Sequence, residues 1–138
     1  MTQNTYMYST YSIHVRVSHA VNVRSCTHFL FPVPAAAPLL NITSITAISI
    51  AVAWQPLPPC QENGVITSYT IAYRMEGGMD MTFTELLVPA ASSTALVSRL
   101  TPYTNYTIKM AASTSAGRGE FGPEVAVLTS EAGTYVYI

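Results

Sequence analysis

The sequence predicts an all-β fold, a seven-stranded Greek-key β-sandwich, and three observations support this prediction. Nine tyrosines, nine prolines and an apolar fraction of 49% favour strands and turns over helices. From Leu39 onward, runs of alternating apolar and polar residues recur at regular intervals, with turn residues between them. Within Leu100–Tyr106 a proline ends one strand and a tyrosine begins the next, a pattern typical of the tyrosine corner in such sandwiches.

The first half of the domain contains three predicted strands. They are Leu40–Thr43, Ile48–Trp54 and Tyr69–Tyr73. In the second of these, the even-numbered residues from Ile48 to Trp54 share the face that we expect to be buried. Prolines end this strand, and Asn63-Gly64 supplies a tight turn. Ile66 is out of phase with Tyr69, which predicts a β-bulge near Thr67.

Four more strands are predicted in the second half. They are Phe83–Val88, Ala95–Ser98, Tyr106–Ser113 and Val125–Thr129. Glu76–Asp80 is the predicted hairpin connection that precedes them. In the strand after the corner, Tyr106, Ile108 and Met110 share one face. Thr107, Lys109 and Ala111 share the other, so this strand should be half-buried.

Trp54, the only tryptophan of the chain, is the predicted centre of the core. We expect it to pack against eight residues of the facing strands: Ile50, Val52, Tyr69, Ile71, Val97, Leu100, Ile108 and Met110. Pro102 lacks a backbone donor and therefore ends the strand before the corner. The Tyr106 ring is expected in the core, with its hydroxyl bonded to upstream backbone.

The chain divides into three predicted segments. Residues 1–33 are an N-terminal extension and proline-rich linker, residues 34–130 are one domain, and residues 131–138 are a C-terminal tail. Three prolines within Pro32–Pro38 favour an extended spacer. The run Tyr11–Ser18 alternates like Tyr106–Ser113, as the remnant of a preceding module would. The simpler alternative is that any two exposed strands share this alternation.

Composition argues against nucleic-acid and membrane partners. The formal net charge is −1 and the six Lys and Arg residues are scattered, whereas phosphate binding needs clustered basic residues. No apolar run approaches the roughly 20 residues of a membrane helix. No signal peptide is recognisable either. We therefore expect no nucleic-acid binding and no membrane insertion by this chain itself.

The sequence also lacks the parts of an enzyme. The domain contains no histidine, no Gly-x-Ser-x-Gly nucleophile elbow and no glycine-rich phosphate loop. We therefore expect no catalysis, no cofactor and no small-molecule substrate. His14, His19 and His28 precede the domain without the spacing of zinc ligands, and we interpret them as solvated side chains rather than a metal site.

Several of these motifs together resemble the fibronectin type III domain. The matching features are Pro38, Ile50-x-Val52-x-Trp54 followed by prolines, Asn63-Gly64 before Tyr69-x-Ile71-x-Tyr73, Leu100-x-Pro102-x-Thr104-x-Tyr106, Gly117-x-Gly119 and Val125-x-Val127-x-Thr129. The resemblance covers residues 34–130 and implies an immunoglobulin-like sandwich with strands A-B-E packed on C-C′-F-G. An immunoglobulin domain would need paired cysteines on strands B and F, which are absent. A cytokine-receptor module would need a second tryptophan.

The resemblance implies a non-catalytic protein-interaction or spacer module of a cell-surface receptor, adhesion or matrix protein, with neighbouring modules in a longer chain. Such a module would be extracellular and would bind a protein partner. One alternative is an intracellular structural repeat of the titin kind. Another is a fragment of a receptor-type tyrosine phosphatase, or of a similar multidomain receptor, with no stand-alone role.

Two glycosylation sequons bear on the compartment. They are Asn41-Ile42-Thr43 and Asn105-Tyr106-Thr107. Strand alternation turns Asn41 outward, and Asn105 lies in the corner, so both could carry glycan. Chance sequons are common in a threonine-rich chain, so these two favour the extracellular reading only modestly.

A partner would be expected to contact loops at one pole of the sandwich. The B–C loop (Gln55–Gly64) and the F–G loop (Ser115–Gly122) are predicted at the same pole. Glu62, Arg118 and Phe121 are the candidate contact residues, since Arg and aromatic residues are enriched at interfaces. Alternatively, Phe121 folds down as a plug over the end of the sandwich. Arg118-Gly119-Glu120 resembles the Arg-Gly-Asp of some family members, but the longer Glu favours a simple glycine turn.

The two cysteines leave two alternatives open. Cys60 lies in the B–C loop, and Cys26 precedes the linker that enters at the same pole. The two cysteines could form a disulfide, with the linker allowing Cys26 to reach Cys60, or they could remain as two free thiols.

Overall fold

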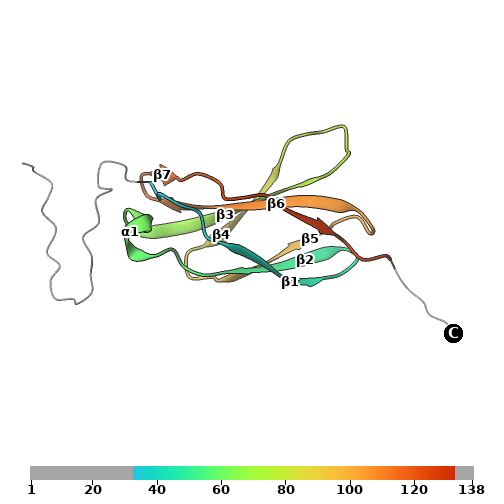
Figure 1. Ribbon diagram of the computed structural model, residues 1–138, viewed down its shortest axis with the longest axis horizontal. Coiled ribbons are helices and arrows are strands. Elements are labelled where there is room, and N and C mark those ends of the chain that lie inside the picture. Colours follow the sequence, from blue (N-terminus) through green and yellow to red (C-terminus); the bar gives the residue numbers. More distant parts are fainter. Residues whose placement is uncertain (1–32, 133–138) are drawn as a thin grey trace, which may run out of the picture.

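The computed structural model describes residues 33–132, which form two antiparallel β-sheets facing each other (Figure 1). The elements in chain order are β1 (Leu40–Ile45), β2 (Ser49–Trp54), α1 (Pro59–Glu62), β3 (Ile66–Met75), β4 (Thr84–Pro89), β5 (Thr94–Ser98), β6 (Asn105–Thr114), β7 (Gly117–Arg118) and β8 (Val125–Leu128). The predicted all-β sandwich is confirmed.

One sheet has three strands in the order β1-β2-β5, and the other has five. In the larger sheet β4, β3 and β6 are neighbours, and β7 and β8 both pair with β6. These are the A-B-E and C′-C-F-G arrangements that the resemblance implied. The strand count is eight because the predicted F–G loop contains an additional two-residue strand, β7, whereas the predicted last strand is present as β8. Between β7 and β8, the backbone N–H groups of Gly119 and Gly122 donate hydrogen bonds to the carbonyls of Ala112 and Met110, so the chain still follows β6.

The core lies between the sheets, where the predicted residues are buried. Trp54 is 3% exposed, and the rings of Trp54 and Tyr69 pack edge to face with centroids 5.3 Å apart. All eight predicted neighbours of Trp54 belong to the same buried cluster. The cluster is completed by Leu57, Val88, Tyr106, Ala112 and Val127.

The start of β2 differs from the prediction. Ile48 was expected on the buried face with Ile50, but it is 58% exposed. The strand begins one residue later because the Thr46 hydroxyl accepts backbone hydrogen bonds from Ile48 (3.2 Å) and Ser49 (2.9 Å), which forms a turn. The predicted bulge in β3 is present, since its pairing with β6 shifts register between Ile66 and Ser68.

The loop between β2 and β3 contains one helical turn that the sequence did not predict. Pro59 opens α1, where its missing N–H costs nothing. Asn63 ends it in the left-handed conformation (φ 54°), and Gly64 follows at φ 136°. The predicted Asn63-Gly64 turn is therefore the C-terminal cap of this helix.

The proline-rich segment is packed onto the domain from Val33 onward rather than being a free spacer. Pro34 and Pro38 are buried. The Ala35 N–H donates to the Gln61 carbonyl at 2.8 Å, and the Asn63 side-chain amide donates to the Val33 carbonyl at 2.9 Å. Here the chain crosses the pole of the sandwich.

Opposite this pole, the connection between β3 and β4 projects away from the sandwich (Figure 1). Its turn contains Gly77 at φ 79°. The Asp80 carboxylate accepts hydrogen bonds from the Thr82 N–H and hydroxyl, and these bonds lower the pKa of Asp80. The predicted hairpin connection is present.

Candidate functional site: the outer face of the larger sheet and the pole beside it

The B–C and F–G loops lie at the same pole, where both contact the entering segment (Figure 1). Val33 accepts a hydrogen bond from Asn63, and its side chain lies 3.3 Å from the position that a Cβ on Gly117 would take. A Cβ on Gly119 would lie only 2.5 Å from the Pro34 carbonyl oxygen. Gly117 and Gly119, which flank Arg118, thus allow close packing against the entering segment, in agreement with the predicted glycine turn.

Arg118 and Phe121 are brought together by the structure. The Arg118 guanidinium lies 4.6 Å from the centroid of the Phe121 ring. The same guanidinium donates to the Glu85 carboxylate at 3.0 Å. Because β7 and β4 are on opposite sides of β3 and β6, this contact spans the outer face of the larger sheet.

Alternating basic and aromatic side chains continue across this face. Lys109 Nζ lies 5.0 Å from the Phe121 ring and 4.0 Å from the Phe83 ring. The Arg74 guanidinium lies 4.6 Å from the Phe83 ring. We call this series the cation–aromatic ladder: Arg118, Phe121, Lys109, Phe83 and Arg74.

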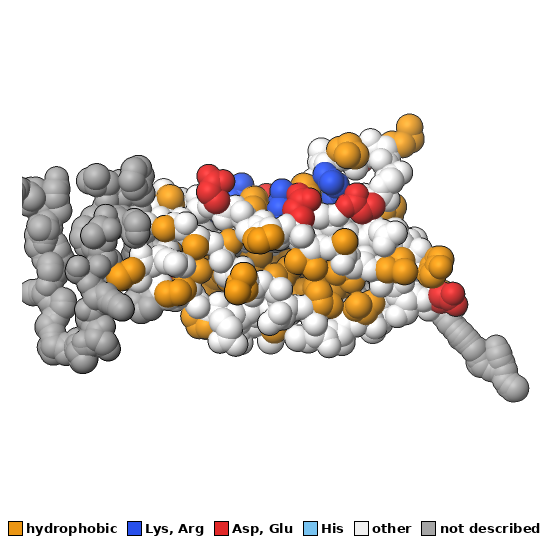
Figure 2. All heavy atoms as spheres, viewed as in Figure 1, with side chains coloured by type: hydrophobic (Ala, Val, Ile, Leu, Met, Phe, Trp, Pro, Cys, Tyr) orange, Lys and Arg blue, Asp and Glu red, His pale blue; other side chains and the backbone are white. Residues whose placement is uncertain are grey.

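Each cation of the ladder also has a carboxylate partner. Besides the Arg118–Glu85 pair, Lys109 lies 3.5 Å from Glu124 and Arg74 lies 3.9 Å from Glu76. Figure 2 shows basic and acidic side chains gathered along one side of the molecule. The surface therefore carries both signs of charge, with no excess that would select a polyanion.

The ladder covers the middle of the outer face. Ala72 and Ala111 point to this side of the sheet, yet they are 1% and 0% exposed. Sequence alternation assigned Lys109 and Ala111 to the second face of this strand, but it did not predict that this face would also be covered. The long side chains of the ladder lie over small residues, and their stems and rings exclude water from the sheet.

Phe121 takes neither of its two predicted positions fully. It is half-buried on the outer face, beside Lys109 and Arg118, so it is not a plug over the end of the sandwich. Its ring is also not fully exposed, because it already packs against the side chains of Lys109 and Arg118. Arg118 keeps 42% of its side chain exposed.

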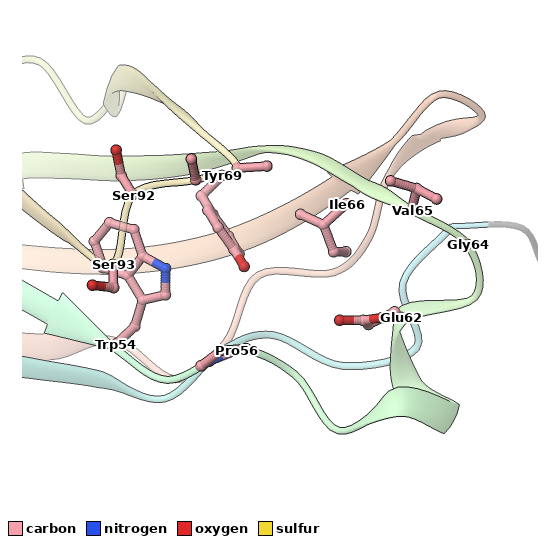
Figure 3. Close-up of a pocket in the computed structure, with 11 residues that line it drawn as sticks. Trp54, Pro56, Glu62, Gly64, Val65, Ile66, Tyr69, Ser92 and Ser93 are labelled. Atoms are coloured by element: carbon pink, nitrogen blue, oxygen red, sulfur yellow. The ribbon is translucent and has the colours of Figure 1, made fainter. Parts of the chain in front are cut away.

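Glu62 belongs to a separate feature, a pocket of about 400 Å³ at the end of the gap between the sheets (Figure 3). Trp54, Tyr69, Ile66 and Ser92 are among the other residues that line it. Burial, and secondly the charge of Glu62, raise the pKa of the Tyr69 hydroxyl, while the Trp54 indole N–H acts in the opposite direction. The structure thus does not place the three predicted contact residues in one cluster.

The tyrosine corner is formed as predicted. Tyr106 is buried, and its hydroxyl oxygen accepts the Thr101 N–H at 2.9 Å. The Thr129 hydroxyl, which is buried, donates to the Thr101 carbonyl at 2.7 Å and accepts the Thr104 N–H at 2.9 Å. Besides Tyr106, the side chain of Thr129 near the end of the domain therefore stabilises the corner by hydrogen bonds.

Both sequon asparagines are exposed. Asn41 is on β1, and Asn105 is the first residue of β6. Glycosylation at either site remains a prediction. Cys60 lies in α1 and is disulfide-bonded. Cys26 lies outside the described residues, so the pairing of these two cysteines stays a prediction.

Other elements of the sequence analysis fall outside the part of the chain that the structure describes. They are the run Tyr11–Ser18 and the histidines at 14, 19 and 28. Within residues 33–132, no helix is long and apolar enough to cross a membrane. The same residues contain no group of three or more His, Cys, Asp or Glu that could hold a metal ion.

The sequence profile of the fibronectin type III domain matches residues 35–127. The chain therefore belongs to the fibronectin type III family. It is 35% identical over 92 residues to mouse protein sidekick-1, and 37% identical over 91 residues to human neogenin. These matches cover 67% and 65% of this chain. The FN5 domain of Drosophila Lar superposes with a TM-score of 0.58 at 27% identity, covering 72% of this chain and 100% of that structure.

The matches cover a small part of the curated relatives. The aligned region is 4% of sidekick-1 and 6% of neogenin. This chain is thus homologous to single domains of cell-surface receptors and adhesion proteins, which are far longer than itself.

Proposed function

We propose that this domain is an extracellular protein-interaction module of a longer receptor or adhesion protein, and that the cation–aromatic ladder is its docking surface. The observation that carries the proposal is the Arg118–Phe121 pair on the outer face of the larger sheet. Arginine and aromatic side chains are enriched among the residues that dominate binding energy. Family membership and the receptor relatives support the general class.

The energetics of the ladder suit reversible docking. An exposed ion pair such as Arg118–Glu85 contributes only about 0–1 kcal/mol, so a partner carboxylate could replace Glu85 at little cost. The stacked ring of Phe121 meanwhile keeps the guanidinium in place, which reduces the entropy lost on binding. A protein partner with an acidic residue at the centre of its contact surface fits this arrangement.

Substitution on this surface tests the proposal. A partner is first captured from the surface of cells with the full chain, and its affinity is then measured for Arg118→Ala and Phe121→Ala. Both should weaken binding by roughly tenfold or more, as for contacts at the centre of an interface. Glu120→Ala is the matched control, because Glu120 is exposed in the same loop but lies outside the ladder. Equal affinities for all four proteins would refute the docking surface.

Glycan occupancy separates the extracellular proposal from the alternative of an intracellular structural repeat. Expressed through the secretory pathway, the chain should carry N-glycan at Asn41, Asn105 or both, because both are exposed. Deglycosylation in heavy-oxygen water followed by mass spectrometry reads each site separately. If neither asparagine is modified, the sequons do not support an extracellular module, and the result favours the alternative of an intracellular structural repeat.

A further inference from the structure

The pocket at the end of the gap between the sheets has an amphipathic lining. Apolar groups line much of it: the side chains of Pro56, Val65, Ile66, Ala90 and Ala91. Its volume of about 400 Å³ has room for one large side chain. Figure 3 shows that its walls come from the end of β2, from the segment after α1, from β3 and from the turn before β5.

A buried polar group is directed into this pocket. The Trp54 indole nitrogen is 97% buried with its side chain, yet no acceptor lies within hydrogen-bonding geometry. In Figure 3 it faces the space between Trp54 and Tyr69. The Tyr69 hydroxyl is the neighbouring polar group that this donor affects, since the indole N–H lowers the pKa of Tyr69 against the larger effect of burial. The indole N–H and the Tyr69 hydroxyl therefore form the polar inner end of the pocket.

A single charged group faces the same space from the opposite side. The Glu62 carboxyl extends toward the Tyr69 hydroxyl in Figure 3. Among the residues that line the pocket, Glu62 is the only acid, and none is Lys or Arg. The pocket therefore offers an anion on one side and apolar wall beside it, with the polar groups of Trp54, Tyr69, Ser92 and Ser93 on the other side.

We propose that this pocket binds an arginine side chain presented by a peptide segment of the protein partner. The guanidinium pairs with Glu62, and the methylene stem lies along Val65 and Ile66. Arginine fits better than lysine because its planar guanidinium forms two parallel bonds to a carboxylate and is more weakly hydrated. The identity of the occupant as a protein rests on the proposed function, but the site itself does not involve the ladder.

A direct test uses the only tryptophan of the chain as the reporter. In a ¹⁵N-labelled full-length chain, Trp54 gives one indole N–H resonance. Titration with N-acetyl-arginine amide should shift it saturably, with a dissociation constant on the order of 1 mM for so small a ligand. Glu62→Gln should weaken this binding severalfold while leaving thermal unfolding unchanged, since Gln conserves the shape of Glu.

Two neutral probes show whether charge is recognised. N-acetyl-norleucine amide has an apolar stem without a cation and should bind more weakly than the arginine amide. Equal shifts with both probes would mean an apolar void, and would overturn the proposal. An absence of any shift with the arginine amide, or no effect of Glu62→Gln, would also overturn it. N-acetyl-citrulline amide, which keeps the planar donors but lacks the charge, should fall between the two.

The chain's own N-terminal residues are the competing occupant. They include Arg16 and Arg24 and no acidic residue. If Arg24→Gln or Arg16→Gln alone moves the Trp54 resonance without added ligand, the pocket belongs to that segment and the proposal of an external arginine fails. These measurements need no partner, so their outcome is independent of the Arg118→Ala test of the ladder.

Discussion

The Tyr106 hydroxyl accepts the backbone N–H of Thr101, five residues earlier in the chain, at 2.9 Å. This one contact joins the strand that follows the corner to the turn that precedes it. Tyr106→Phe removes the acceptor and leaves a half-buried N–H unpaired, so it should lower the free energy of unfolding by about 1–3 kcal/mol. Urea unfolding measures the change. Tyr103→Phe is the control, because Tyr103 is 64% exposed in the same turn and should be neutral. Equal midpoints for both variants would contradict the assigned role of the hydroxyl.

Trp54 fills the centre of the core, and its removal should be the most damaging single truncation. Trp54→Ala should cost about 3–5 kcal/mol, which is a large part of the stability of a domain this size. Circular dichroism during thermal unfolding would show whether the domain still folds. Leu87→Ala, at a site 70% exposed on β4, should change stability by less than about 0.5 kcal/mol. A mild effect of Trp54→Ala would mean that the core is organised around other residues.

The raised pKa of Tyr69 predicts a loss of stability at alkaline pH. In the unfolded chain the phenol ionises near pH 10, whereas in the folded chain burial and Glu62 keep it neutral to higher pH. This contribution is therefore fully present below about pH 10 and is lost as the pH rises through the folded-state pKa. Urea midpoints measured from pH 8 to pH 12 should fall less steeply for Tyr69→Phe than for the unchanged chain. Parallel curves would show that Tyr69 does not contribute.

Close packing between the entering segment and the F–G loop predicts a contrast between two glycines. In Gly119→Ala the new Cβ would lie 2.5 Å from the Pro34 carbonyl oxygen, so the backbone must move, at a cost of about 1–3 kcal/mol. In Gly78→Ala the nearest atoms are 3.9 Å away, which is ordinary contact. Thermal unfolding should therefore separate the two variants. Similar melting points would mean that the packing of residues 33–34 against the F–G loop contributes little to stability.

The cysteines give a prediction that chemistry can test directly. Cys60 is disulfide-bonded, and Cys26 is the only other cysteine in the sequence, so we expect a Cys26–Cys60 link in secreted material. Peptide mapping without reduction should recover the two cysteine peptides as one linked species. Alkylation of both thiols before any reduction would contradict this expectation.

The sequence predicted the sandwich because its strands are half-buried and alternate with a period of two. That period assigns each residue to a face, so Ile50, Val52 and Trp54 were placed correctly in the core. It failed at Ile48, where a threonine hydroxyl and not hydrophobicity decides where the strand begins.

The ladder and the pocket could not be predicted in the same way. Alternation places Lys109 on the outer face, but it does not show that Arg118 would reach Glu85, 33 residues away in sequence. That reach depends on the path of the F–G segment, which the contact between Gly119 and Pro34 constrains. Likewise, whether the Trp54 N–H finds an acceptor depends on the relative positions of two sheets, about which local sequence carries no information.

The projecting connection between β3 and β4 also determines which methionines of this domain oxidise first. Met79 and Met81 lie on it and are 102% and 63% exposed, whereas Met110 is 1% exposed in the core. Peroxide should therefore convert the thioethers of the two loop methionines to sulfoxides first. Because those side chains are largely exposed, their oxidation should leave the core intact, and the sulfur of Met110 should oxidise only in molecules that have already unfolded.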